Sequence, residues 1–159
     1  MAQSRLLFSP AARQALRRGF TLLSDLMALS LGPRGRLVAS ARENPRKSPE
    51  FLNDGATIAR RFLGLPDRFE TMGAFLARHI AWRMEETVGD GATTAVVIAR
   101  QIIQEADRLA AAGYNLMSVR RGLEKALPVV IESLAAQAHP WTVLTKSLRS
   151  AVPSPVRKH

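Results

Sequence analysis

Four long stretches of the sequence carry apolar residues at intervals of three and four, and glycine-containing breaks separate them. The breaks lie at Gly32-Pro33, at Gly89-Asp90-Gly91 and at Gly113. Glycine accepts the left-handed conformation that closes a helix, and proline cannot continue one. The spacing therefore predicts helices over about residues 10–29, 67–87, from the second break to 112, and 116–136.

The expected helices differ in how they should begin and pack. Ser9 is a good N-cap for the first, with Pro10 at the first helical position. The helix over 67–87 places one apolar set on one side, namely Phe69, Met72, Leu76, Ile80 and Met84. The helix that ends near 112 has a wide apolar face and should be central. Pro128 should kink the last helix.

Strand-like runs over residues 37–41 and 51–53 flank a polar stretch that contains two prolines. This pattern predicts a long hairpin with a mobile tip. Residues 140–159 carry four basic and no acidic side chains and hold little to bury, which predicts a loose basic tail. The predicted fold is thus mainly α, a bundle of about four long helices with one β-hairpin, within residues 1–139.

Composition excludes several classes of protein. The chain of 159 residues has no cysteine, so disulfides, thiolate metal sites and a cysteine nucleophile are excluded. Its charge-free apolar stretches are far shorter than the ~18 residues of a membrane span, which predicts a soluble protein without membrane contact.

The acid-free, arginine-containing N-terminus could pass for a transit peptide. However, its apolar residues recur at helical spacing, which a cleaved leader would not need. We therefore expect this segment to belong to the mature protein and the protein to be cytoplasmic.

The net charge of +10 is unevenly placed along the chain. Residues 1–61 contribute +7, residues 62–139 contribute −1, and residues 140–159 contribute +4. A basic balance invites a nucleic-acid interpretation. However, the excess does not form one periodic face, and aromatic residues are not interleaved with the arginines as a stacking surface requires. Nucleic acid is therefore an unlikely partner.

Three turns could carry chemistry. Gly89-Asp90-Gly91-Ala92-Thr93-Thr94 opens an apolar helix, where free amides and the helix dipole attract phosphate, threonine hydroxyls can donate, and Asp90 could hold Mg²⁺. The simpler alternative is that Asp90 only caps the helix. Ser30 to Arg36 could form an anion-binding nest or merely stop a helix. Asn53 to Thr57 places an acid in a tight turn, or makes a plain Asx turn.

Together, the order and spacing of these turns closely resemble the N-terminal part of a GroEL-type chaperonin subunit. The resemblance covers about residues 5–139. The matching motifs are Leu31-Gly32-Pro33-Arg34-Gly35-Arg36, Asp54-Gly55, Phe69-Glu70-Thr71-Met72-Gly73-Ala74, Gly89 to Thr94, Ala112-Gly113-Tyr114-Asn115-Leu116-Met117 and Arg121-Gly122.

The resemblance implies half of an equatorial, ATP-binding domain, with ATP and Mg²⁺ as cofactors. It implies that Asp90 binds Mg²⁺ and that Asp54 lies beside the γ-phosphate as the candidate catalytic acid. The implied nucleotide-binding residues are Ser30, Leu31, Gly32, Pro33, Asp90, Gly91, Ala92, Thr93 and Thr94. Two departures should weaken binding: Asn53 stands where bacterial relatives usually have lysine, and Ala92 replaces the first threonine of the usual triple.

A subunit of this family is much longer, with intermediate and apical domains that have no counterpart after residue 140. The sequence therefore predicts a truncated chaperonin-like protein, associated with protein folding and ATP-binding by resemblance, whose ability to hydrolyse ATP is left open. One alternative is a non-enzymatic interaction protein that joins full-length chaperonin subunits, another partner or its own copies through the hairpin 37–53. An inactive gene remnant is another.

Overall fold

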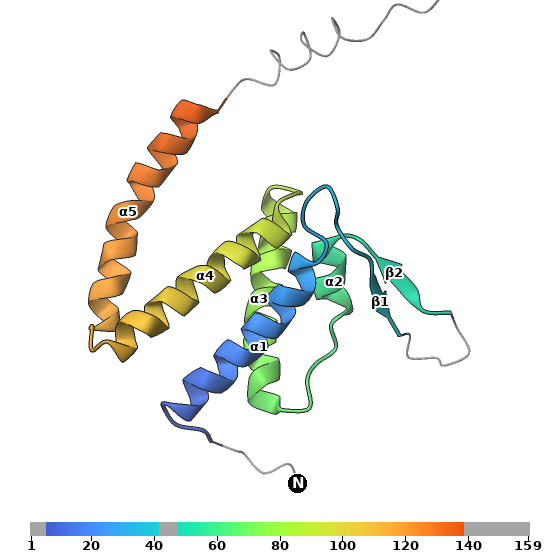
Figure 1. Cartoon of the computed structure of the whole chain (residues 1–159), viewed down its shortest axis with the longest axis horizontal. Helices are drawn as coiled ribbons and strands as arrows, with labels where there is room; N and C mark the ends of the chain where they lie inside the picture. The colour runs from blue at the N-terminus through green and yellow to red at the C-terminus, as the bar shows by residue number, and fades with distance from the viewer. Residues whose placement is uncertain (1–5, 42–47, 139–159) are drawn as a thin grey trace, which may run out of the picture. The chain divides into compact units, whose positions relative to one another are not determined.

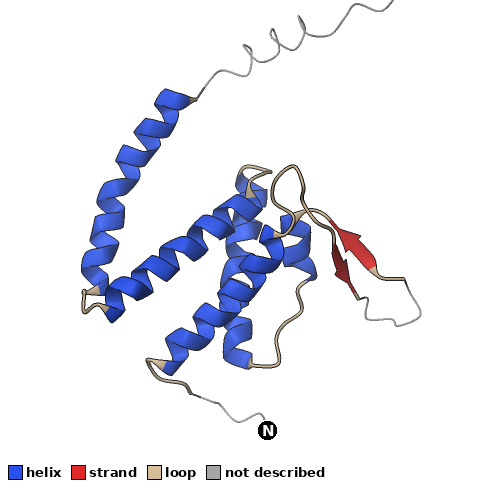
Figure 2. Cartoon of the chain, in the orientation of Figure 1, coloured by secondary structure: helices blue, strands red, loops and turns tan. Residues whose placement is uncertain are grey.

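The computed structural model describes residues 6–41 and 48–138. Most of the predicted hairpin tip and the whole predicted tail lie outside the described residues. The elements in chain order are α1 (Ala11–Ala28), β1 (Val38–Ser40), β2 (Glu50–Leu52), α2 (Gly55–Arg61), α3 (Arg68–Thr87), α4 (Ala92–Ala111) and α5 (Leu116–Gln137) (Figure 1). Figure 2 shows helix through most of the described chain and a single pair of strands, so the predicted mainly α fold with one hairpin is confirmed.

Helix α3 begins as its sequence predicts, whereas α1 does not. Asp67 caps α3, because its Oδ1 accepts hydrogen bonds from the amides of Phe69 (2.7 Å) and Glu70 (3.0 Å). The expected N-cap of α1 is wrong: Pro10 occupies the cap position, and no side chain caps the helix. The Ser9 hydroxyl instead accepts a bond from the Arg13 guanidinium at 3.4 Å.

The hairpin is short, antiparallel and attached to α2. Val38 pairs with Leu52 and Ser40 with Glu50. The guanidinium of Arg61 donates two hydrogen bonds to the Glu50 carboxylate, at 2.9 and 3.1 Å, and these bonds raise the pKa of Arg61. This charged pair links β2 to the end of α2.

Helices α1 and α3 pack closely across glycine. A Cβ added to Gly73 would lie 2.7 Å from the carbonyl carbon of Leu16, and one added to Gly19 would lie 2.9 Å from the Cα of Glu70. The buried face of α3 consists of Gly73, Ala74, Ala77 and Ala81. The predicted apolar face of this helix is therefore only partly correct: Ile80 and Met84 pack against the core, whereas Met72 and Leu76 are 54% and 56% exposed. Small residues take the core side because a large side chain would hold the helices apart.

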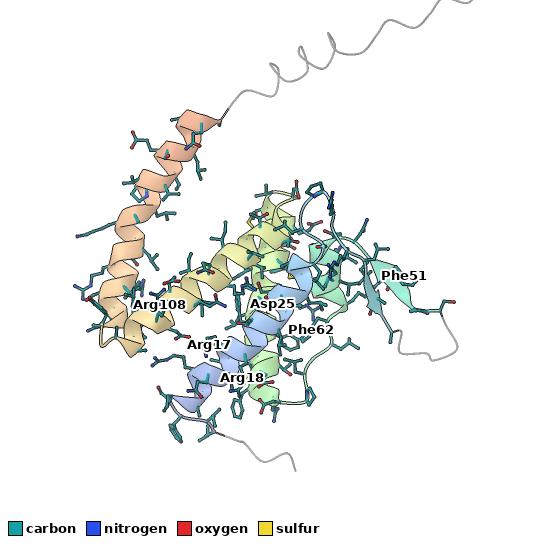
Figure 3. The ribbon with its side chains drawn as sticks, viewed as in Figure 1. Arg17, Arg18, Asp25, Phe51, Phe62 and Arg108 are labelled. Carbon is teal, nitrogen blue, oxygen red and sulfur yellow. The ribbon has the colours of Figure 1, made fainter. Side chains whose placement is uncertain are left out.

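Helix α4 enters the core through its first turns. Ala92 and Val96 are its buried residues, and Ala99 and Ile103 lie partly buried against the core. Ile102, from the same predicted face, is 42% exposed, so the helix borders the core and the predicted central position is wrong. Ion pairs join α4 to α1 farther along: the Arg100 guanidinium binds Asp25, and Arg17 lies 3.5 Å from Asp107. Figure 3 labels Arg17 and Asp25 on α1.

The chain divides into two compact units, Met1–Arg108 and Leu109–His159. In the second, Asn115 caps α5 by accepting a bond from the amide of Met117 at 2.8 Å. Helix α5 contains Pro128 and has no buried residue. Among the helices of residues 6–41 and 48–138, none is long and apolar enough to span a lipid bilayer.

Candidate functional site

A polar hollow of about 190 Å³ opens where α4 begins. Segments far apart in the sequence contribute to it: the turn after α1, the turn before α2, the end of α3 and the first turn of α4. Its lining residues are Leu31, Asp54, Glu85, Gly89, Asp90, Gly91, Ala92, Thr93 and Thr94.

The first turn of α4 presents free backbone donors to this hollow. The hydrogen-bond ladder of the helix opens with the amide of Ala95, which donates to the carbonyl of Gly91 at 2.9 Å. The amides of residues 92–94 precede that bond and have no acceptor within the helix. Gly89 and Gly91 have φ values of +81° and +78°, so the turn needs glycine at both positions. No side chain within the described ranges accepts a bond from these amides, so the turn suits an anionic oxygen.

Asp90 does not cap α4 in the usual way. Its Oδ1 accepts a bond from the adjacent amide of Gly91 at 2.6 Å, rather than from an amide in the first turn of the helix. The residue is exposed. Its carboxylate therefore has oxygen atoms free to bind a cation. If Asp90 served only as a helix cap, its carboxylate would accept bonds from the first turn of α4 instead.

Asp54 caps α2, a helix that the sequence interpretation missed. Oδ1 accepts a bond from the amide of Ala56 at 3.3 Å, and Oδ2 accepts from the amide and the hydroxyl of Thr57 at 2.8 and 2.7 Å. Partial burial by itself would raise the pKa of Asp54, but the bonds from Thr57 and Ala56 and the charge of Arg60 outweigh it and lower the pKa. The carboxylate is thus ionised at neutral pH and is a weak proton acceptor.

A direct contact holds the two turns together. A Cβ added to Gly55 would overlap the hydroxyl oxygen of Thr93 and would lie 3.1 Å from its Cβ. The start of α2 and the start of α4 therefore touch through a glycine and a threonine. This contact fixes Asp54 relative to the first turn of α4.

The hollow's charge is negative before any ligand enters. Asp54, Glu85 and Asp90 are carboxylates, and neither lysine nor arginine lines it. Magnesium prefers oxygen ligands and is usually held by one or two carboxylates together with substrate phosphates. In the part of the chain that the structure describes, no three acidic or histidine side chains gather closely enough to enclose a metal ion by themselves. The donor set therefore fits an ion shared with phosphate.

The sequence matches the TCP-1/cpn60 chaperonin family over residues 23–158. The chain belongs to that family. The recognised resemblance to a GroEL-type chaperonin is thereby confirmed, and membership supports a chaperonin-like role in protein folding. The family is known to bind ATP with Mg²⁺, which agrees with the chemistry of the donor set.

The structure of this chaperonin brings together seven of the residues that the sequence assigned to a site. They are Leu31, Asp54, Asp90, Gly91, Ala92, Thr93 and Thr94. Ser30, Gly32 and Pro33 do not line the hollow. The Ser30 hydroxyl donates to the carbonyl of Met27 at 2.7 Å, which closes α1, and Gly32 has a φ of +87° in the turn that follows.

Glu85 is the lining residue that sequence reasoning missed. It belongs to a pair with Glu86 in the last turn of α3, where no basic residue is present. Negative charge at the carboxyl end of a helix opposes the helix dipole. Two acids in that position, a few residues before a glycine-rich turn, are the signal that could have identified it.

Proposed function

We propose that this chaperonin chain binds Mg-ATP in the hollow at the start of α4. One observation carries the proposal: the uncapped first turn of α4 shares a single hollow with three carboxylates from three segments. Amides suit phosphate oxygens, and carboxylates suit the accompanying cation. A cytoplasmic location is part of this proposal.

Each part of the site has a separate role in the proposal. The amides of residues 92–94 and the hydroxyls of Thr93 and Thr94 donate to phosphate oxygens. Gly89 leaves room for the ligand, because a Cβ there would meet nothing within 4 Å. Asp90 holds the cation, which when bound neutralises charge on the phosphate oxygens. Ala92 is only 5% exposed and offers its backbone alone.

Asp54 is the proposed neighbour of the terminal phosphate. Its lowered pKa makes it a poor general base, so we assign it to orienting water or supporting the cation rather than to removing a proton. Hydrolysis also needs stabilisation of the charge that develops on the transferred phosphoryl group, and the lining supplies no cationic side chain for it. The proposal is therefore one of binding.

The negative lining makes this binding strictly dependent on the cation. ATP without Mg²⁺ brings several negative charges toward three carboxylates and should bind far more weakly than Mg-ATP. Asn53, beside Asp54 in the sequence, offers no positive charge to offset the repulsion. The binding of ATP itself, and not only its hydrolysis, should therefore require Mg²⁺.

Thermal unfolding tests the proposal. Mg-ATP at about 100 times its dissociation constant should stabilise the folded chain by about 2.7 kcal/mol. Asp90→Ala should remove most of that stabilisation, whereas Glu86→Ala, an exposed acid outside the hollow, should retain it. A melting temperature that does not respond to Mg-ATP in the parent chain would refute the proposal.

A second candidate function is association through the hairpin, with full-length chaperonin subunits or with a second copy. Leu37, directly before β1, is 63% exposed, and Phe51, labelled on β2 in Figure 3, is 65% exposed. Exposed apolar residues on a short sheet with unpaired edges favour strand addition. Size-exclusion chromatography with and without a full-length chaperonin tests this. A monomer that leaves the chaperonin peak unchanged would exclude it.

A further inference from the structure

A second, larger hollow lies between α2 and α3. Its volume is about 510 Å³, within the range of sites that hold small organic ligands. Ala56 and Ala59 from α2, both buried, form part of its wall. Its other lining residues are Arg60 of α2 and Phe75, Arg78, His79, Trp82 and Glu85 of α3. Glu85 also lines the hollow at α4, so the two are neighbours.

The wall from α3 is aromatic. Phe75, His79 and Trp82 recur at helical spacing, which places them on one side of α3. The rings of His79 and Trp82 lie 5.5 Å apart between centroids, with 39° between their planes. Phe75 and Trp82 are 42% and 45% exposed, so their rings remain accessible to a ligand. Flat accessible rings favour a planar aromatic group.

The same hollow carries two arginines that form no close ion pair within the described residues. The Arg60 guanidinium donates to the Thr57 hydroxyl at 3.1 Å, and that of Arg78 donates to the carbonyl of Phe62 at 3.4 Å. Arg78 also lies 5.8 Å from the ring centroid of Phe75. Within residues 6–41 and 48–138, neither guanidinium forms an ion pair. The charge of Arg60 also acts on Asp54, which lies outside this lining. The lining itself holds two arginines and one acid, Glu85, and is therefore net positive.

From these observations we propose that the hollow between α2 and α3 binds small planar aromatic anions. The ring of the ligand stacks among Phe75, His79 and Trp82. Its carboxylate or sulfonate binds Arg60 or Arg78, whose donors are otherwise used for neutral acceptors. This site differs in its chemistry from the proposed phosphate site. Its lining is aromatic and cationic, whereas the lining of the hollow at the start of α4 is polar and acidic.

The probe for the test is 2-naphthoate, followed by NMR through the indole N–H resonance of Trp82. The chain has two tryptophans, so Trp141→Phe assigns the resonance. A ligand of this size, with the binding free energy per non-hydrogen atom usual for drug-sized ligands, should bind with a Kd of about 1 mM. Two matched probes separate the contributions: 2-naphthalenemethanol keeps the ring without charge, and cyclohexanecarboxylate keeps the charge without the ring.

Saturable binding of 2-naphthoate, at least about five-fold tighter than of either matched probe, supports the proposal. Arg60→Gln and Arg78→Gln should each weaken it by up to about five-fold, the usual limit for an accessible ion pair. Arg83→Gln, an exposed arginine of α3 outside the hollow, should not. Circular dichroism melts check that each variant is folded. Equal affinity for 2-naphthalenemethanol, equal loss in Arg83→Gln, or no saturation by about 10 mM would overturn the proposal.

Discussion

The contact between Gly55 and Thr93 offers a sharp test of how the α4 hollow is built. Gly55→Ala would place a methyl group on the Thr93 hydroxyl oxygen, at a position where ordinary contact begins at 3.4 Å. Thr93 is β-branched and held in a helix, so few alternative side-chain conformations relieve the overlap. Overpacking of this kind costs about 1–3 kcal/mol, and we expect Gly55→Ala to lower the free energy of unfolding by that amount.

A double-mutant cycle isolates this contact. Thr93→Ala removes the overlapping oxygen but keeps the Cβ, which would still be 3.1 Å from the new methyl group. Gly55→Ala should therefore cost at least ~1 kcal/mol less in the Thr93→Ala background than in the parent chain. Urea unfolding followed by Trp82 fluorescence, in a Trp141→Phe background, measures each corner with the denaturant slope as a check. If the two substitutions change the free energy of unfolding additively, within ~0.5 kcal/mol, the contact is refuted.

The remaining predictions concern the core and the cap of α2. Gly73→Ala should lower the free energy of unfolding by about 1–3 kcal/mol in urea titrations. Gly122→Ala in α5, where a Cβ would meet nothing within 4 Å, should cause no loss. Because the pKa of Asp54 is lowered, its stabilisation is full above the ordinary value of 3.8 and is lost as pH falls through the folded pKa. Asp54→Asn should therefore reduce the pH dependence of unfolding below pH 3.8; an unchanged slope would contradict the cap.

Local signals made the helices predictable from the sequence, whereas their packing was not. The apolar spacing and the glycine breaks placed α3 and α4 within a residue or two. The buried side of α3 was missed because the pattern favours large apolar residues, while close approach of two backbones at Gly73 selects small ones. Helix α2 was missed because seven residues are too few for periodicity to show.

The sequence indicated which types of residue form the candidate site, but it was less able to indicate which residues line the hollow. Gly91 to Thr94 at a helix start indicate anion binding from local chemistry alone. That Asp54 lines the same hollow follows from a tertiary contact, Gly55 against Thr93, which no local pattern reveals. Ser30 was expected in the site, but its hydroxyl bonds to the backbone of α1 instead. Glu85 was missed, although its place beside Glu86 at the end of α3, just before the glycine-rich turn, was a sequence signal for it.

Amide NMR of the ¹⁵N-labelled chain, titrated with ATP in the presence and absence of Mg²⁺, tests directly whether the start of α4 holds the phosphates. With Mg²⁺, the largest shifts should fall on residues 89–94 and on the turns at Leu31 and Asp54. Without Mg²⁺, the shifts should be much smaller at the same ATP concentration, because three carboxylates line the hollow. Absence of shifts at residues 92–94, or equal shifts without Mg²⁺, would contradict the proposed site.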